Sequence, residues 1–134
     1  MSTGPVPGNG IALTIPAGKV VFWSALAQAA WSQYIQLRDS TGNAVFTCQG
    51  ESPDGHSPTQ IGQGFFQAGG QSDSYTLWLG TNGGAQWSQV IWAQDVIGAG
   101  GTAYLTRYAF GTEDGADNDY NDTYLQLQWF AYLG

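Results

Sequence analysis

Short runs of alternating polar and apolar residues, separated by turn-forming residues, restrict the fold more than any other feature. In the last run, leucines and a tryptophan occupy every second position from residue 125 to 129, and glutamines lie between them. Successive side chains of a β-strand point to opposite faces, so this pattern predicts a strand with one face in the core. Runs that predict strands cover residues 11–15, 20–27, 33–39, 44–49, 60–68, 74–81, 86–96, 102–110 and 123–133.

These runs predict an all-β protein, an antiparallel β-sandwich of about nine strands with no significant helix. With 134 residues, the chain has the length of a single domain that buries a sizeable core. Residues 1–9 are rich in Pro and Gly and are expected to form a flexible N-terminal arm, whereas residues 10–134 form the sandwich domain. No internal sequence repeat is visible, which argues against a propeller or trefoil fold.

Charge and composition exclude several classes of partner. Only Lys19, Arg38 and Arg107 oppose ten Asp and Glu residues, giving a formal net charge of −7. Nucleic acids and anionic membranes would be repelled, so neither is expected as a partner, and no apolar stretch is long enough for membrane insertion. The first residues lack the pattern of a signal peptide, so we expect synthesis in the cytoplasm. Export or display at the cell surface would then use a non-classical route, without a cleaved signal. Cys48 is the single cysteine, so the chain forms no internal disulfide.

Half of the acidic residues lie in one stretch, residues 113–122, which reads EDGADNDYND. Carboxylates this close repel one another, and a hard cation such as Ca²⁺ removes the conflict by binding about six to eight oxygen atoms. The stretch is not an EF-hand, because Asp122 and Gln128 stand where that loop needs Gly and a bidentate Glu. Four carboxylates of this stretch balance the charge of two Ca²⁺ ions: those of Glu113, Asp117, Asp119 and Asp122. We therefore predict that they hold two ions.

Residues 111–122, GTEDGADNDYND, resemble the signature of the LecB-type bacterial lectins, which bind fucose and mannose through paired calcium ions. An ungapped match continues from Pro16 and Ala17 into the second predicted strand and its loop, and both this chain and the family end in a glycine, here Gly134. The middle of the chain agrees with the family in strand rhythm only. The resemblance therefore implies a calcium-dependent lectin domain that recognises mannose- or fucose-type sugars.

The resemblance also implies individual roles. Residues expected to bind the two calcium ions are Glu113, Asp117, Asp119, Asn121, Asp122, Gln28 and Gly134. Residues expected to contact the sugar are Asp114, Asp117, Asp119, Asn121, Ala29, Ala30, Trp31 and Gly134. In the family, the carboxylate of the terminal glycine reaches a calcium ion of a partner subunit, so the resemblance further implies a homodimer or a higher homo-oligomer.

Two departures from the family pattern affect these roles. Gln28 stands where family members usually carry an Asn ligand, so its amide oxygen would reach the second ion from a longer side chain. The last strand is also two residues longer before Gly134. In the loop that tunes sugar preference, Ala29 and Ala30 offer no side-chain hydroxyl, and Trp31 either stacks on the sugar ring or packs against a neighbouring strand or subunit.

Three alternatives remain on the sequence alone. Calcium could only rigidify the loop of a structural or adhesin-type sandwich, with no direct sugar coordination. Paired carboxylates also suit glycoside hydrolysis, but metal ligation leaves no free acid/base pair and no other catalytic group is evident, so we expect no enzyme. The last alternative is a solvated acidic loop without a bound ion.

Overall fold

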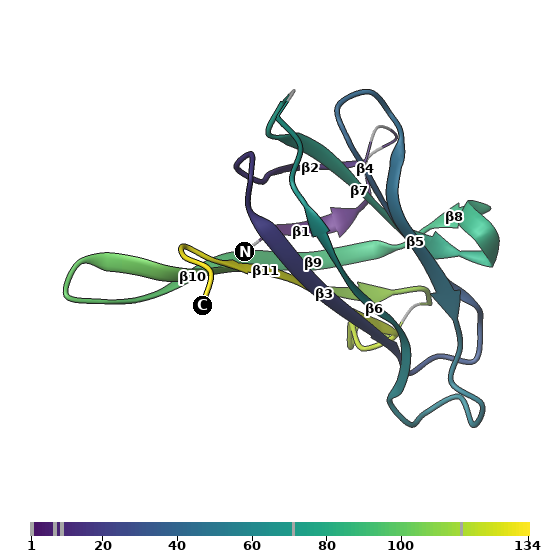
Figure 1. Ribbon diagram of the computed structural model, residues 1–134. Helices are drawn as coiled ribbons and strands as arrows, with labels where there is room; N and C mark the ends of the chain where they lie inside the picture. The colour runs from purple at the N-terminus through teal and green to yellow at the C-terminus, as the bar shows by residue number, and fades with distance from the viewer. Residues whose placement is uncertain (1, 7, 9, 71, 116) are drawn as a thin grey trace.

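The computed structural model describes residues 2–6, 8, 10–70, 72–115 and 117–134, which form two antiparallel sheets packed face to face (Figure 1). The first sheet has the strand order β1-β9-β10-β11-β3-β6, and the second has the order β2-β7-β4-β5, with the short β8 paired to β7. The first sheet comprises β1 (Ser2–Pro5), β9 (Gln89–Ala99), β10 (Thr102–Glu113), β11 (Thr123–Phe130), β3 (Val20–Ala27) and β6 (Thr59–Gln67). The second comprises β2 (Ile11–Thr14), β7 (Ser74–Thr81), β4 (Gln33–Arg38), β5 (Ala44–Gly50) and β8 (Gln86–Trp87).

The prediction of an all-β antiparallel sandwich is confirmed. Within the described residues the structure has eleven strands, two more than expected, because β1 is added and residues 86–96 divide into β8 and β9. The described residues contain no α-helix, only the 3₁₀ turn Asn82–Gly84. The last strand ends at Phe130 and not at residue 133. The amide of Ala131 still donates to the carbonyl oxygen of Tyr104, and residues 131–134 lie outside the strand.

The expected flexible arm over residues 1–9 is wrong for Ser2–Val6. Ser2–Pro5 forms β1, which pairs with Gln89–Trp92 at the edge of the first sheet. Val6 is buried, and its amide donates to the carbonyl oxygen of Ser88 at 2.9 Å. An edge strand tolerates Pro5 because its outer side needs no backbone donor. Residues 1, 7 and 9, which the prediction also covered, lie outside the described residues.

The core fills the space between the two sheets. On β11, alternate residues from Thr123 to Trp129 are buried, and on β4 the same alternation buries Gln33, Ile35 and Leu37. This is the spacing that a half-buried strand requires. Of the tryptophans other than Trp31, three are buried and two are partly buried: Trp23, Trp78 and Trp129 in the first group, and Trp87 and Trp92 in the second. Within the described residues, no helix is long and apolar enough to span a membrane.

One hairpin projects beyond the sandwich. Figure 1 shows the ends of β9 and β10 extending together past the other strands, with the C-terminus near their base. The hairpin closes through Gly100 and Gly101, whose φ angles of 59° and 82° match the left-handed positions of a type I′ turn. β11 follows β10 only as far as the pair Leu105 and Phe130, so the outer part of the hairpin lacks a third strand on that side.

Candidate metal centre

The acidic residues lie in the loop that joins β10 to β11 at one end of the sandwich. Glu113 ends β10 and Thr123 begins β11, and the amide of Asp122 closes the loop by donating to the carbonyl oxygen of Thr112 at 3.0 Å. Asn118 and Tyr120 have φ angles of 60° and 53°, a left-handed conformation that costs energy for a residue such as Tyr. The loop therefore follows a tightly constrained path, which turns its carboxylates toward one another.

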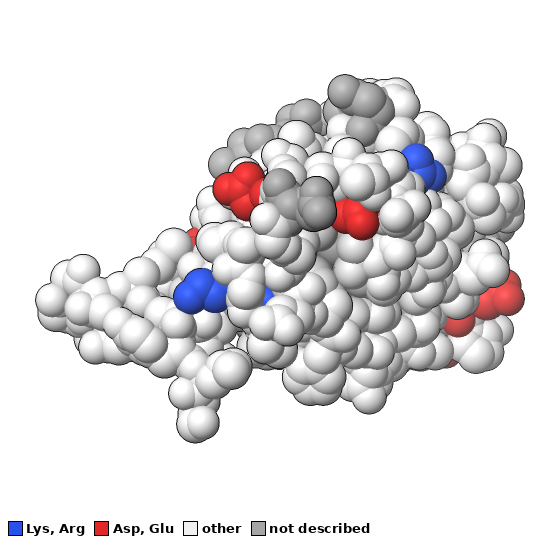
Figure 2. All heavy atoms as spheres, turned by 45° about the horizontal axis from the view of Figure 1, so that its top comes forward, with Lys and Arg blue, Asp and Glu red and all other residues white. Residues whose placement is uncertain are grey.

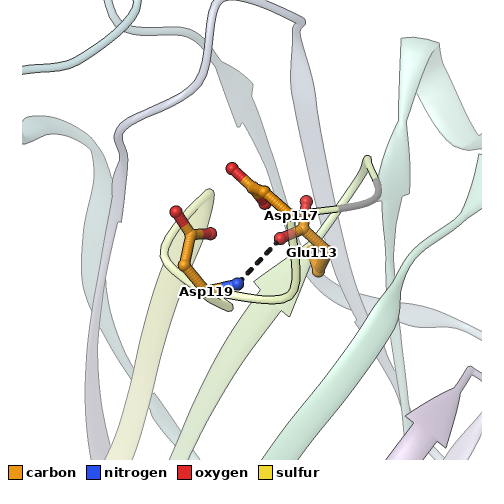
Figure 3. A group of neighbouring side chains, drawn as sticks. All are labelled: Glu113, Asp117 and Asp119. Carbon is orange, nitrogen blue, oxygen red and sulfur yellow. Dashed lines mark hydrogen bonds between the residues drawn. The ribbon is translucent and has the colours of Figure 1, made fainter.

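Glu113, Asp117 and Asp119 form the first group of potential metal ligands. Each offers a carboxylate oxygen, and these oxygens lie within 4.8 Å of one another. Figure 3 shows the three side chains grouped around the loop. Glu113 is buried, and its two oxygens accept hydrogen bonds from the amides of Gly115 at 2.7 Å and of Asp119 at 3.2 Å. These bonds hold the carboxylate of Glu113 toward the other two.

Glu113, Asp114 and Asp122 form a second group, again with one carboxylate oxygen each within 4.8 Å. The amide of Asp114 donates to Oδ2 of Asp122 at 2.8 Å, which places the two residues side by side. Burial, together with the neighbouring carboxyls of Glu113 and Asp114, raises the pKa of Asp122 to about 7. Glu113 belongs to both groups, so the two candidate sites are adjacent. A dense set of carboxylate oxygens of this kind fits Ca²⁺, a hard cation.

Gln28 and Asn121 also meet at this loop. Backbone and side chain of Gln28 both hold the loop: its amide donates to the carbonyl oxygen of Asp122 at 2.9 Å, and its Nε2 donates to that of Asn121 at 2.8 Å. The structure thus places Gln28 beside the acidic loop, and its role as a metal ligand stays a prediction. In this geometry its side-chain nitrogen is used by the protein, which leaves its amide oxygen as the atom able to bind a metal ion.

Gln33 is a part of the site that the sequence analysis missed. This buried residue lies on β4, and its Nε2 donates to Oδ2 of Asp114 at 2.7 Å and to the carbonyl oxygen of Trp31 at 3.1 Å. Its Oε1 accepts from Oγ1 of Thr123 at 2.7 Å. Gln33 therefore joins the acidic loop to the loop after β3. The signal for it was present in the sequence, because a Gln occupies a core-facing position in the alternation of Gln33, Ile35 and Leu37.

An open pocket of 280 Å³ lies directly beside the carboxylates. Its lining comes from three loops: Ala29, Ala30, Trp31, Gly55, Asp114, Gly115 and Asp122. Trp31 is 54% exposed, so the ring is available to a ligand at the rim. The structure thus brings the predicted sugar-contacting residues Ala29, Ala30, Trp31 and Asp114 together around one pocket.

The loop between β5 and β6 supplies a wall of this pocket that sequence reasoning did not find. Asp54 organises the loop: its Oδ1 accepts from Oγ of Ser52 at 2.9 Å and from the amides of His56 and Ser57 at 2.9 and 2.7 Å. The amide of Ser52 donates to the carbonyl oxygen of Ala29 at 2.9 Å, which docks this loop on the neighbouring one. These hydrogen bonds, above all those from Ser57, hold the pKa of Asp54 well below its usual range.

Comparison with known proteins agrees with this geometry. The profile of the fucose-binding lectin II family, PA-IIL, matches residues 13–131. The chain belongs to this family. A comparison with curated protein sequences finds no match. The family assignment confirms the resemblance that the acidic stretch indicated.

Solved structures of PA-IIL-type lectins have the same fold. The high-affinity mannose-binding lectin of Ralstonia solanacearum is 27% identical, with a TM-score of 0.76 over 96% of this chain and 100% of that chain. The C-terminal domain of the BC2L-C lectin of Burkholderia cenocepacia is 26% identical, with a TM-score of 0.72 over 92% and 96% of the two chains. The Chromobacterium violaceum lectin CV2L, solved with alpha-methyl-fucoside, is 22% identical and has a TM-score of 0.74 over 93% and 98%, a similarity of fold.

Gly134 is the one predicted site residue that lies away from the acidic loop of its own chain. β11 begins next to the acidic loop, runs eight residues to Phe130, and is followed by Gly134, an exposed residue. A strand of this length spans about 26 Å, so the terminal carboxylate lies at the opposite end of the sandwich. Within one subunit, Gly134 therefore does not complete the site. The predicted role in a partner's site remains a prediction.

Proposed function

We propose that this member of the PA-IIL family, a carbohydrate-binding lectin, recognises mannose- or fucose-type sugars with the help of two Ca²⁺ ions held by the loop between β10 and β11. One observation carries the proposal: two adjacent clusters of carboxylate side chains share Glu113, and two members of the second cluster, Asp114 and Asp122, line an open pocket. The ions would be held by Glu113, Asp117, Asp119 and Asp122, with amide oxygens from Asn121 and Gln28. Bound calcium would offer coordination positions that neighbouring sugar hydroxyls can fill.

The residues of the pocket would orient the sugar. Asp114, held in place by Nε2 of Gln33, can accept a hydrogen bond from a sugar hydroxyl, and such bonds to a charged group are about twice as strong as neutral ones. Ala29 and Ala30 leave room for the ring, because their side chains are small. The exposed ring of Trp31 at the rim can stack on an apolar face of the sugar.

Isothermal titration calorimetry with methyl mannoside and methyl fucoside, in calcium and in chelator, tests this proposal. We expect binding only in calcium, and about two calcium ions per chain in a separate metal titration. Equal sugar binding in chelator would contradict calcium-mediated recognition. Calcium binding that stabilises the protein without any sugar binding would instead support a structural or adhesin-type role. An assay for released reducing sugar would detect the glycosidase alternative.

A further inference from the structure

A groove of 520 Å³ on the outer face of the second sheet lies outside the candidate metal centre. It opens between β2, β7 and the turn after β4, and its walls include Thr14, Arg38, Asp39 and Trp78. Figure 1 shows this turn at the top of the sandwich and the acidic loop in its lower half. Along β4, Arg38 is five residues from Gln33, which contacts the acidic loop, so the two places are about 17 Å apart.

A stacked pair, Arg38 on Trp78, forms one wall of the groove. The guanidinium carbon of Arg38 lies 4.2 Å from the centroid of the Trp78 ring, and its Nε donates to Oε1 of Gln36 at 2.5 Å. The indole is itself held in place, because its ring centroid lies 5.0 Å from that of Trp87. Gly10 leaves room for the indole, since a Cβ at Gly10 would lie 2.9 Å from Cε2 of Trp78. The guanidinium is thus fixed before a ligand binds, which lowers the entropic cost of binding.

The stack leaves donors of Arg38 available to a ligand. Within the described residues Arg38 makes no ion pair, whereas Arg107 is paired with Asp95 at 2.7 Å. A guanidinium has five N–H donors in one plane, and in the described part of the chain only the Nε donor of Arg38 is used. The N–H groups of Nη1 and Nη2 therefore remain for a ligand that occupies the groove.

Asp39 supplies an acceptor next to these donors. Its Oδ1 accepts from the amide and the hydroxyl of Thr41 at 2.9 and 2.6 Å, and from the amide of Asn43 at 3.0 Å. These bonds, first of all that from the hydroxyl of Thr41, hold the pKa of Asp39 below its usual value, so its carboxylate is charged. Among the described residues no donor contacts Oδ2 of Asp39, which leaves this oxygen as the acceptor for a ligand.

The charges of the groove favour a neutral ligand. Of the described residues that line it, only Arg38 and Asp39 are charged, so an anion would meet the carboxylate and a cation would meet the guanidinium. Figure 2, which brings the top of Figure 1 toward the viewer, shows that charged side chains on this face are few and lie in small separate groups. A neutral ligand therefore fits the described lining better than an ion of either sign.

The other polar side chains match a ligand that is rich in hydroxyl groups. Apolar surface from Ala12 lies beside them and can contact the C–H groups of a sugar ring. A hydroxyl group both donates and accepts hydrogen bonds, as the hydroxyl groups of a saccharide do. Four residues with exposed or half-buried hydroxyl side chains line the groove: Thr14, Ser40, Ser74 and Thr76.

The size of the groove indicates a ligand of more than one ring. Its 520 Å³ is nearly twice the 280 Å³ of the pocket beside the acidic loop. The smaller pocket holds one sugar residue in the proposed function, and this comparison of sizes rests on that function. On the same scale the groove has room for two sugar residues, so a methyl glycoside would fill only part of it.

We propose that the groove is a second saccharide site, which binds neutral oligosaccharides of at least two residues without calcium. Nη1 and Nη2 of Arg38 would donate to sugar oxygens, and Oδ2 of Asp39 would accept from a sugar hydroxyl. Within the described residues, both groups of potential metal ligands lie in the acidic loop and neither includes a residue of the groove. One chain would then carry two saccharide sites, and a glycan that reached both would bind with increased avidity.

The first experiment probes an array of neutral and acidic oligosaccharides with the full chain, in calcium and in EDTA. We expect neutral oligosaccharides to stay bound in EDTA, with dissociation constants within two-fold of those in calcium by calorimetry, and methyl mannoside to bind only in calcium. If no neutral oligosaccharide binds in EDTA, the second site is excluded. Binding in EDTA of uronic or sialic acid glycans alone would also overturn the proposal. A loss of methyl mannoside binding in calcium would concern only the proposed function of the acidic loop.

Substitutions separate the two sites in calcium. Ala12→Trp fills the groove and should weaken binding of the neutral oligosaccharide at least ten-fold, while methyl mannoside binds as in wild type. Asp119→Ala should give the reverse result. Gln49→Trp is the matched control, because Gln49 is exposed on β5 and does not line the groove, and it should change neither affinity. If Ala12→Trp binds the oligosaccharide as wild type does, the groove is not the site.

Substitutions at Arg38 test its donors. Arg38→Gln should weaken oligosaccharide binding at least ten-fold, and Arg38→Lys at least three-fold, because Lys keeps the charge but loses the planar set of donors. Circular dichroism checks that each variant is folded. In nuclear magnetic resonance spectra of wild type, the indole N–H signal of Trp78 should shift with the oligosaccharide and not with methyl mannoside. Unchanged affinity in Arg38→Gln, or an oligosaccharide that binds without shifting this signal, would overturn the proposal.

Discussion

Gln33 offers the sharpest test of how the acidic loop is built. Replacing it with Leu keeps a similar volume but removes both donors and the acceptor that connect β4 to Asp114, Trp31 and Thr123. The hydroxyl of Thr123, only 2% exposed, would lose its acceptor, which costs about 1–3 kcal/mol for a buried polar group. Asp114 would lose the hydrogen bond that its carboxylate accepts from Gln33. A hydrogen bond to a charged acceptor normally contributes about 1.5–3 kcal/mol, but the contribution is smaller here because Asp114 is only half-buried.

We therefore expect Gln33→Leu to lower the free energy of unfolding by about 2–4 kcal/mol, which corresponds to a fall in Tm of roughly 8–16 °C in a domain of this size. Urea unfolding followed by tryptophan fluorescence, in chelator, measures this without any contribution from bound metal. Gln36→Leu is the matched control, since this Gln lies on the same strand but makes an exposed hydrogen bond to Thr47, and its effect should stay within about 0.5 kcal/mol.

A double-mutant cycle isolates the buried contact. Thr123→Val removes the hydroxyl that donates a hydrogen bond to Oε1 of Gln33. In that background, Gln33→Leu should therefore lower the free energy of unfolding by at least about 1 kcal/mol less than it does in wild type. With calcium present, Gln33→Leu should also weaken sugar binding, because Asp114 loses its support. If Gln33→Leu unfolds within about 0.5 kcal/mol of wild type, or if the two substitutions are additive, Gln33 is not the link between the two loops.

Four further predictions follow from the same site. Asp119→Ala should abolish calcium and sugar binding in calorimetry, whereas Asp114→Ala should weaken sugar binding and spare calcium; equal loss of calcium in both would contradict this division. The folded-state pKa of Asp122 is raised to about 7, so between pH 4 and 7 the calcium-free protein binds more protons when it is folded than when it is unfolded. Its Tm should therefore fall as the pH rises from 4 to 7, and Asp122→Asn should make this dependence of Tm on pH weaker. Asp54→Ala should release the loop that contributes Gly55 to the pocket and reduce sugar affinity about three- to ten-fold without loss of calcium, measured against Asp73→Ala, in the loop before β7, as the control. A C-terminal tag should weaken sugar binding more than the same tag at Met1 if Gly134 completes a partner's site, and equal binding by both would exclude that role.

The sequence by itself determined the class of the fold and the centre of the site. Alternation with a period of two is a local property that follows from strand geometry, so runs such as 123–133 identify strands without knowledge of their partners. The density of carboxylates between Glu113 and Asp122 is equally local, because residues a few positions apart in one loop must share the same small volume. For the same reason, the resemblance carried by this stretch pointed to the correct family.

Tertiary structure decided everything that depends on residues distant in the chain. Gln33 reaches Asp114 across 81 positions, and Gly55 meets the pocket only because the loop after β5 docks on Ala29. Ser2–Pro5 forms a strand only because β9 offers an edge, and Pro and Gly in that segment argued locally against it. The outer part of the β9–β10 hairpin likewise projects because β9 and β10 continue beyond the strands on either side. Local propensity determines what a segment can become, whereas pairing between distant segments determines where it ends and which side chains meet.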